Sequence, residues 1–111
     1  MAGTFEITQA KDGDYHFHLK AANGQIILTS QMYKEKSSAE GGIESVKKNA
    51  PNDNSYERKE SHSGAPMFNL KAANHQVIGT SQQYESAEAR EHGIASVKEN
   101  APAATVHDKT T

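Results

Sequence analysis

The sequence contains no cysteine, and this absence removes three kinds of site at once. The chain can form no disulfide, hold no metal through thiolates and offer no cysteine nucleophile. Long apolar runs are missing too, since no stretch approaches the roughly 20 residues that span a bilayer. The opening residues MAGTFE lack a basic segment followed by an apolar one, so we expect no signal peptide. We therefore expect a soluble cytoplasmic protein with no membrane partner.

The sequence also lacks an excess of positive charge. Twelve lysines and arginines stand against 14 aspartates and glutamates, which gives a formal net charge of −2. Neither half of the chain is basic, whereas binding to nucleic acids depends on strong attraction to phosphates. The charge balance makes nucleic acid the less favoured partner.

Apolar residues make up only 34% of the 111 residues, a proportion that leans towards disorder. These residues nevertheless recur at strand and helix spacings, which indicates a small ordered core with a polar exterior. A chain of this length fits one domain, and we expect a single domain over residues 1–111.

The chain is an internal duplication. A shift of 51 residues aligns residues 5–51 with residues 56–102 without a gap, and 23 of the 47 pairs are identical. Two copies are too few for a solenoid, because such arrays usually need three or more repeats to bury their faces. We predict two repeats, 5–54 and 56–107, that close around one shared core with approximate two-fold symmetry.

The first half of each repeat has the period of β-strands. Alternation predicts strands at Phe5–Thr8 and Tyr15–Lys20, and Asn23-Gly24 predicts a hairpin into a third strand, Ile26–Thr29. The second repeat carries Asn74-His75 at the same turn. Histidine tolerates left-handed backbone less readily than glycine, so we expect this hairpin to turn at some local cost.

The second half of each repeat has the period of a helix. One apolar stripe of the first repeat comprises Ala39, Ile43, Val46 and Ala50. Ser37 and Glu40 fit a capping box at its start, and Pro51 ends it. Gly42 and Gly93 recur beside the stripe, and we expect a close approach of helix to sheet there. The sequence thus predicts an α+β fold, a β-β-β-α(-β) unit written twice, with an antiparallel sheet and one helix per repeat.

Two segments extend this pattern. Residues 104–107 follow the second helix and predict a short closing strand, while Tyr56–Lys59 is placed to bridge both repeats. We expect the intact chain to be a monomer, because the duplication supplies covalently what a homodimer would supply by association.

Two motifs resemble those of the small bacterial YegP-like family, also known as UPF0339 and DUF1508. The first motif is F-H-L-K-A-A-N-G at Phe17–Gly24, and the second is G-I-E-S-V-K-K-N-A-P at Gly42–Pro51. Both recur in the second repeat, with His75 in place of the hairpin glycine. The resemblance covers residues 5–102 and implies an α+β pseudo-dimer of two β-β-β-α-β units. It implies no activity, because the family has no established one.

Reactive groups are few and have structural explanations. His16 and His18 share one strand face at a spacing that can hold a metal, but the second repeat has Met67 and Asn69 there. A serine, a tyrosine and a lysine recur in both repeats, as Ser30/Ser81, Tyr33/Tyr84 and Lys47/Lys98. Such a set could support nucleophilic chemistry, but no motif that would activate the serine accompanies it. We expect no enzyme activity, no cofactor and no metal site.

A binding surface is the remaining expectation. Its candidates recur in both repeats: Lys20 and Lys71, Lys47 and Lys98, and Tyr33 and Tyr84. We expect a non-enzymatic interaction module for a protein or peptide. The alternative is a nucleic-acid-binding domain in which the paired lysines contact phosphates and the tyrosines stack on bases.

Overall fold

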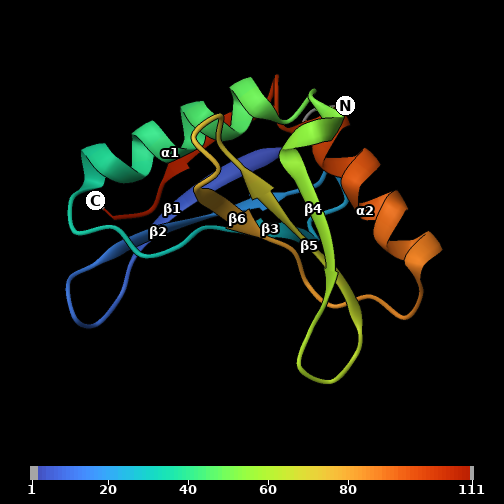
Figure 1. Ribbon diagram of the computed structural model, residues 1–111. Helices are drawn as coiled ribbons and strands as arrows, with labels where there is room; N and C mark the ends of the chain where they lie inside the picture. The colour runs from blue at the N-terminus through green and yellow to red at the C-terminus, as the bar shows by residue number, and fades with distance from the viewer. Residues whose placement is uncertain (1–2, 111) are drawn as a thin grey trace.

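The computed structural model describes residues 3–110 as two strand–strand–strand–helix repeats and one further strand (Figure 1). The elements of the first repeat are β1 (Thr4–Gln9), β2 (Tyr15–Lys20), β3 (Ile26–Thr29) and α1 (Lys36–Asn49). A short 3-10 turn, Asp53–Ser55, leads into the second repeat. Its elements are β4 (Tyr56–Glu60), β5 (Pro66–Lys71), β6 (Val77–Thr80) and α2 (Ala87–Asn100), and β7 (Thr105–Asp108) follows them.

One seven-stranded sheet runs through both repeats in the order β4-β5-β6-β3-β2-β1-β7. The order is symmetric about the β3–β6 pair, where Thr29 lies opposite Thr80. An approximate two-fold axis therefore passes between the repeats, and the predicted tandem duplication in an α+β fold is confirmed. The sheet is mostly rather than wholly antiparallel, because β7 pairs in parallel with β1.

Both helices cover the same face of the sheet, and each reaches across the boundary between the repeats (Figure 1). Helix α1 contacts β5 and β6 of the second repeat, and α2 contacts β3 of the first. Strand alternation and the helical stripes predict eight core residues, and all of them are at most 2% exposed: Phe17, Leu19, Ile43, Val46, Phe68, Leu70, Ile94 and Val97. They belong to one core that both repeats share. Neither helix is long and apolar enough to cross a membrane within the described residues.

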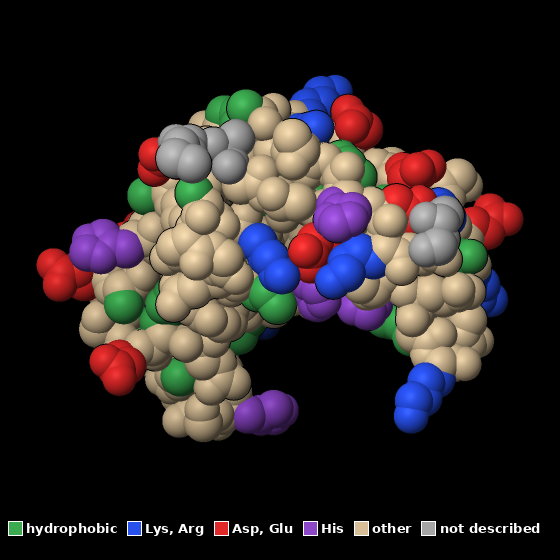
Figure 2. All heavy atoms as spheres, turned by 180° about the vertical axis from the view of Figure 1, so that it is seen from behind, with side chains coloured by type: hydrophobic (Ala, Val, Ile, Leu, Met, Phe, Trp, Pro, Cys, Tyr) green, Lys and Arg blue, Asp and Glu red, His purple; other side chains and the backbone are tan. Residues whose placement is uncertain are grey.

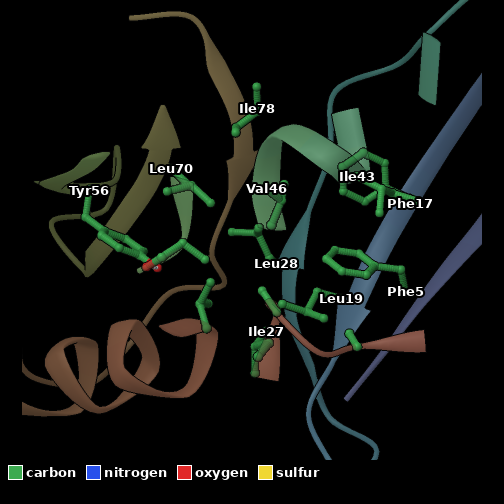
Figure 3. Packing of buried hydrophobic residues seen from close by; sticks show 14 of the residues in the cluster. Phe5, Phe17, Leu19, Ile27, Leu28, Ile43, Val46, Tyr56, Leu70 and Ile78 are labelled. Carbon is green, nitrogen blue, oxygen red and sulfur yellow. Dashed lines mark hydrogen bonds between the residues drawn. The ribbon is translucent and has the colours of Figure 1, made fainter. Parts of the chain in front are cut away.

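The two-fold symmetry is broken at its own axis. Leu28 is fully buried between the repeats, with Tyr56 and Leu70 on one side and Phe5 and Phe17 on the other (Figure 3). Its counterpart in the second repeat is Gly79, and a Cβ at Gly79 would lie 2.6 Å from Leu28 Cδ2. Two leucines would therefore collide at the axis, and a leucine–glycine pair fills the space that a symmetric pair would overfill.

The helical glycines lie against tyrosine rings. Tyr33 stacks on the buried Phe17, with ring centroids 6.3 Å apart and planes inclined by 10°. A Cβ on Gly42 would come within 2.5 Å of the Tyr33 hydroxyl oxygen. The second repeat reproduces this arrangement with Tyr84, Phe68 and Gly93. The predicted close approach exists, and the group that the glycine admits is a tyrosine ring held between helix and sheet.

Of three predictions for segments at the repeat boundaries, two are wrong and one is confirmed. The capping box is wrong, because α1 begins at Lys36 and Ser37 already lies inside it, beyond the N-cap. The bridging role of Tyr56–Lys59 is also wrong, since within residues 3–110 β4 pairs only with β5 and forms one edge of the sheet. The closing strand is confirmed, because β7 forms at residues 105–108 and Thr105 N donates to Gly3 O at 3.2 Å.

The hairpin turns differ as the sequence predicts. Gly24 adopts a φ of 86°, and His75 adopts a φ of 70° at the corresponding position. His75 is the one residue other than glycine with a positive φ in the described chain. The second repeat therefore makes the same turn with a side chain that is strained in this backbone region.

Candidate functional site

The helices leave one face of the sheet uncovered, and we call it the open face. Successive side chains of a strand point to opposite faces, so the residues between buried core positions belong to the open face. The first repeat contributes Glu6, Thr8, His16, His18 and Lys20. The second repeat contributes Glu57, Lys59, Met67, Asn69 and Lys71. His107 and Lys109 join them, because β7 runs in register with β1. Figure 2 shows this side hollowed between two arms, with lysine and histidine side chains gathered around the hollow.

Charge is divided unevenly between the open face and the rest of the molecule. Of the 12 basic and 14 acidic residues, the strands place four lysines and two glutamates on the open face. Eight basic and 12 acidic residues remain elsewhere, so the open face carries a positive excess in a protein whose net charge is −2. Such an excess attracts anionic partners to this face.

The two carboxylates of the open face are neutralised by lysines. Lys20 lies 3.1 Å from Glu6, and Lys109 lies 3.8 Å from the same carboxylate. The bond from Lys20 lowers the pKa of Glu6. In the second repeat Asn69 and Lys71 donate to Glu57 at 3.1 and 3.2 Å, and these bonds lower its pKa. Lys20 and Lys71 therefore occupy matching places, as their recurrence in the sequence indicates.

The histidine pair lies on the open face beside threonines. The rings of His16 and His18 meet edge to face, with centroids 4.8 Å apart. His16 Nε2 lies 3.0 Å from Thr8 Oγ1, and His18 Nδ1 lies 3.3 Å from Thr29 Oγ1. Burial, reinforced by the neighbouring His16, lowers the pKa of His18. No group of three potential metal ligands occurs within residues 3–110.

The remaining lysine and tyrosine candidates do not join Lys20 and Lys71. Lys47 lies on α1, and Lys98 lies on α2, where it forms an ion pair with Asp53 at 2.8 Å. Tyr33 and Tyr84 are packed on the helical side of the sheet, and burial raises the pKa of both hydroxyls. Of the six candidates from the sequence, only Lys20 and Lys71 lie on the open face.

The recurring serines serve the sheet. Ser30 Oγ accepts a hydrogen bond from Phe17 N at 2.9 Å and donates to Gln31 O at 2.7 Å. Ser81 makes the same two bonds, to Phe68 N and Gln82 O. Each hydroxyl therefore bridges two stretches of backbone and is buried with them.

Sequence reasoning missed three members of the open face. Alternation from Tyr56 would have placed Lys59 beside Glu57 on this face. His107 and Lys109 could not have been placed from the sequence, because only the parallel pairing of β7 with β1 brings them to Glu6. The second repeat contributes a hollow beside this face, whose lining includes one acidic residue: Lys59, Glu60, Ser61, His62, Met67, Asn69 and Gln83.

Comparison with known proteins agrees with the duplicated architecture. Residues 10–57 and 61–108 each match the family described as a domain of unknown function, DUF1508. The chain belongs to this family. It is 61% identical over 110 residues to a UPF0339 protein of Acinetobacter baylyi, covering 99% of both chains. It is 54% identical to the UPF0339 protein YegP of Escherichia coli K12, covering 99% of this chain and 100% of YegP.

Two solved structures share the fold at high similarity. The solution NMR structure of a UPF0339 protein from Shewanella oneidensis superposes with a TM-score of 0.93 at 48% identity, over 99% of this chain and 93% of that one. The solution NMR structure of YegP from Escherichia coli, a protein of unknown function, also gives 0.93, at 54% identity over 99% and 95%. These relatives bear names that describe a family and no activity.

Proposed function

We propose that this protein is a non-enzymatic interaction module that binds an acidic segment of a protein partner on the open face. The observation that carries this proposal is the segregation of charge. Four lysines lie on the open face against two glutamates, although the whole chain has more acidic than basic residues. An acidic segment is attracted to this face and repelled by most of the remaining surface.

The engagement of the recurring polar residues supports a role without catalysis. Ser30 and Ser81 are bonded to backbone on both sides, and Tyr33 and Tyr84 are packed beneath the helices. The residues that the two repeats share are thus occupied by the fold. In contrast, the middle of the open face differs between repeats, with His16 in place of Met67 and His18 in place of Asn69. Two unlike halves suit one asymmetric partner chain.

Nucleic acid is the second candidate, because phosphates would be attracted by the same lysines. Stacking on bases would need exposed aromatic faces beside those lysines. Tyr33 and Tyr84 lie on the opposite side of the sheet from Lys20 and Lys71, each with one face against a phenylalanine. An acidic protein segment therefore fits the face better than a nucleic acid does.

The test is a titration of the intact protein with fluorescent probes at low salt, about 20 mM, where surface charges are weakly screened. The probes are a ten-residue polyglutamate, a ten-residue polylysine and a ten-nucleotide thymidine strand. We expect polyglutamate to bind, with amide shifts confined to the open face, and polylysine not to bind there. Tighter binding of the thymidine strand would favour the second candidate. Failure of both anions to bind would overturn the proposal.

A matched pair of variants sharpens the titration. Lys59→Gln/Lys109→Gln removes two charges from the open face, and we expect it to weaken polyglutamate binding about three- to tenfold. Lys34→Gln/Lys48→Gln removes the same charge from exposed positions outside that face and should leave the affinity within about twofold. Equal effects of the two variants would show that net charge alone attracts the probe.

A further inference from the structure

The two outer strands of the sheet, β4 and β7, differ in how many charged side chains protect them. At one edge, four of the five residues of β4 are charged, and Arg58 bonds to Glu91 of α2 and to Asp53. Arg90 of α2 donates to Lys59 O of β4 at 3.1 Å. Charged side chains and covering contacts of this kind are how natural proteins keep edge strands from pairing with other chains.

The β7 edge is also tied to a helix, because Asp108 pairs with Lys36 of α1 at 2.6 Å, but Val106 places an apolar side chain in the middle of the strand. Val106 is 46% exposed in the middle of this strand, although valine is an apolar residue. It lies beside a groove between β7 and α1 that is lined by Glu40, Gly41, Ile43, Glu44 and Val106, here called the β7 groove. A Cβ added to Gly41 would meet nothing within 4 Å, so this part of the wall is open.

The backbone of β7 offers hydrogen-bonding groups along the groove. Thr105 N and Lys109 N donate to β1, at 3.2 and 2.9 Å. Alternate residues of a strand direct their backbone groups to opposite sides, so Val106 and Asp108 direct theirs away from β1. Within the described residues β7 pairs with β1 alone. These outward groups can therefore pair with an incoming extended segment.

Two carboxylates determine which segment fits. Glu40 and Glu44 are exposed on the rim, and neither forms an ion pair within residues 3–110. Residues four apart on a helix lie about 5–6 Å from each other. Alternate residues of a strand on one face are separated by about 6.6–6.8 Å, which is a close match. Lysine or arginine side chains at alternate positions of a bound strand would thus reach both carboxylates.

We infer that the β7 groove binds an extended peptide segment by strand addition, with an apolar side chain beside Val106 and basic side chains at Glu40 and Glu44. The inference goes beyond the proposed function, because it assigns a second surface with the opposite charge preference. Backbone pairing with Val106 and Asp108 supplies affinity, and the acidic rim supplies selectivity.

The test uses two peptides on the intact protein, each with threonine at alternate positions and a central leucine. The basic peptide is KTKTLTKTK and the acidic one is ETETLTETE. We expect the basic peptide to give saturable amide shifts in β7 and in Glu40–Glu44 of α1, and the acidic peptide to give none there. Absence of such shifts at about 1 mM basic peptide, or equal shifts from both peptides, would overturn the inference.

Two variants separate the rim from the strand edge. Glu40→Gln/Glu44→Gln should weaken the basic peptide about three- to tenfold, while the control Glu85→Gln/Glu88→Gln, exposed near the start of α2, should not. Val106→Pro removes an outward N–H and leaves the donors to β1 in place, so it should abolish binding without unfolding the protein. If both variants bound like the unchanged protein, strand addition at the β7 groove would be excluded.

Discussion

The two repeats share nearly half of their aligned residues, yet they occupy unlike positions in the sheet. Strand β1 of the first repeat is covered by β7, and its Ile7 is fully buried. Strand β4 of the second repeat forms an outer edge, and Arg58 stands at the position of Ile7. Isoleucine suits a covered strand, whereas an arginine paired with Glu91 and Asp53 suits an edge.

The two repeats retain the residues that pack each helix on its own strands, and they diverge where their neighbours in the sheet differ. The stacked tyrosine, its helical glycine and the bridging serine recur because each repeat packs one helix on its own strands. The outer strands, the axis and the middle of the open face differ because the two repeats have different neighbours there. On the open face the divergent residues, such as His16 and Met67, make the two halves unlike, while Lys20 and Lys71 recur.

One repeat expressed alone lacks the strands of the other repeat against which its helix packs. A fragment of residues 1–54 keeps α1 but loses β5 and β6, which α1 contacts in the whole protein. About fifty residues are close to the limit for one stable core. We expect the fragment to be unfolded by circular dichroism, or to form a homodimer by sedimentation equilibrium. A folded monomer would contradict the shared core.

Ile7 of the covered strand β1 and Arg58 of the edge strand β4 occupy corresponding positions, and exchanging them tests the difference directly. Ile7→Arg places an unpaired charge in a fully buried site and should cost about 3–5 kcal/mol in the free energy of unfolding. Arg58→Ile loses only exposed ion pairs and should cost at most about 1 kcal/mol. The latter also places an apolar side chain in the middle of the edge strand β4, so we expect concentration-dependent association in sedimentation velocity. Similar urea midpoints for both variants would mean that β1 and β4 are equally buried at this position, which contradicts the difference described above.

The pair at the axis tests the broken symmetry. Leu28→Ala should destabilise the protein by about 2–5 kcal/mol, because this side chain is fully buried. Gly79→Ala should cost about 1–3 kcal/mol by overpacking against Leu28. All three nearest atoms belong to the Leu28 side chain beyond its Cβ, so Leu28→Ala removes the clash. The double variant should therefore be more stable than the summed single losses by about 1 kcal/mol or more. Additive urea unfolding energies would contradict the direct contact.

The sequence was sufficient to predict the parts of the fold that depend on period and repetition. Alternation located the strands, the stripe around Ile43 located α1, and the 51-residue offset located the symmetry. The start of α1 was missed because Ser37 has the right chemistry for an N-cap but is the second residue of the helix, whose N-cap is Glu35. In α2 the cap is Ser86, whose hydroxyl accepts from Ala89 N, although its counterpart in α1 is Glu35.

The candidate surfaces were predictable only in part, because they depend on which strands become neighbours. Recurrence identified Lys20 and Lys71, and alternation could have added Lys59. The same recurrence also selected Tyr33 and Tyr84, which recur for a packing reason. Neither edge could be assigned, because that requires knowing that β7 pairs with β1 and that β4 remains outside.

The smallest expected difference between the repeats lies in their second hairpin turns. His75 has a φ of 70°, a conformation that costs a residue with a Cβ about 1–2 kcal/mol, whereas Gly24 adopts it freely. His75→Gly should remove that strain but lose some entropy on folding, for a net stabilisation of about 0.5–1 kcal/mol. Gly24→His should destabilise by a similar amount, and both changes are measured as shifts of the urea midpoint at constant slope. If Gly24→His is destabilising while His75→Gly has no effect, the second turn has contacts that compensate its backbone, and the two turns are not equivalent.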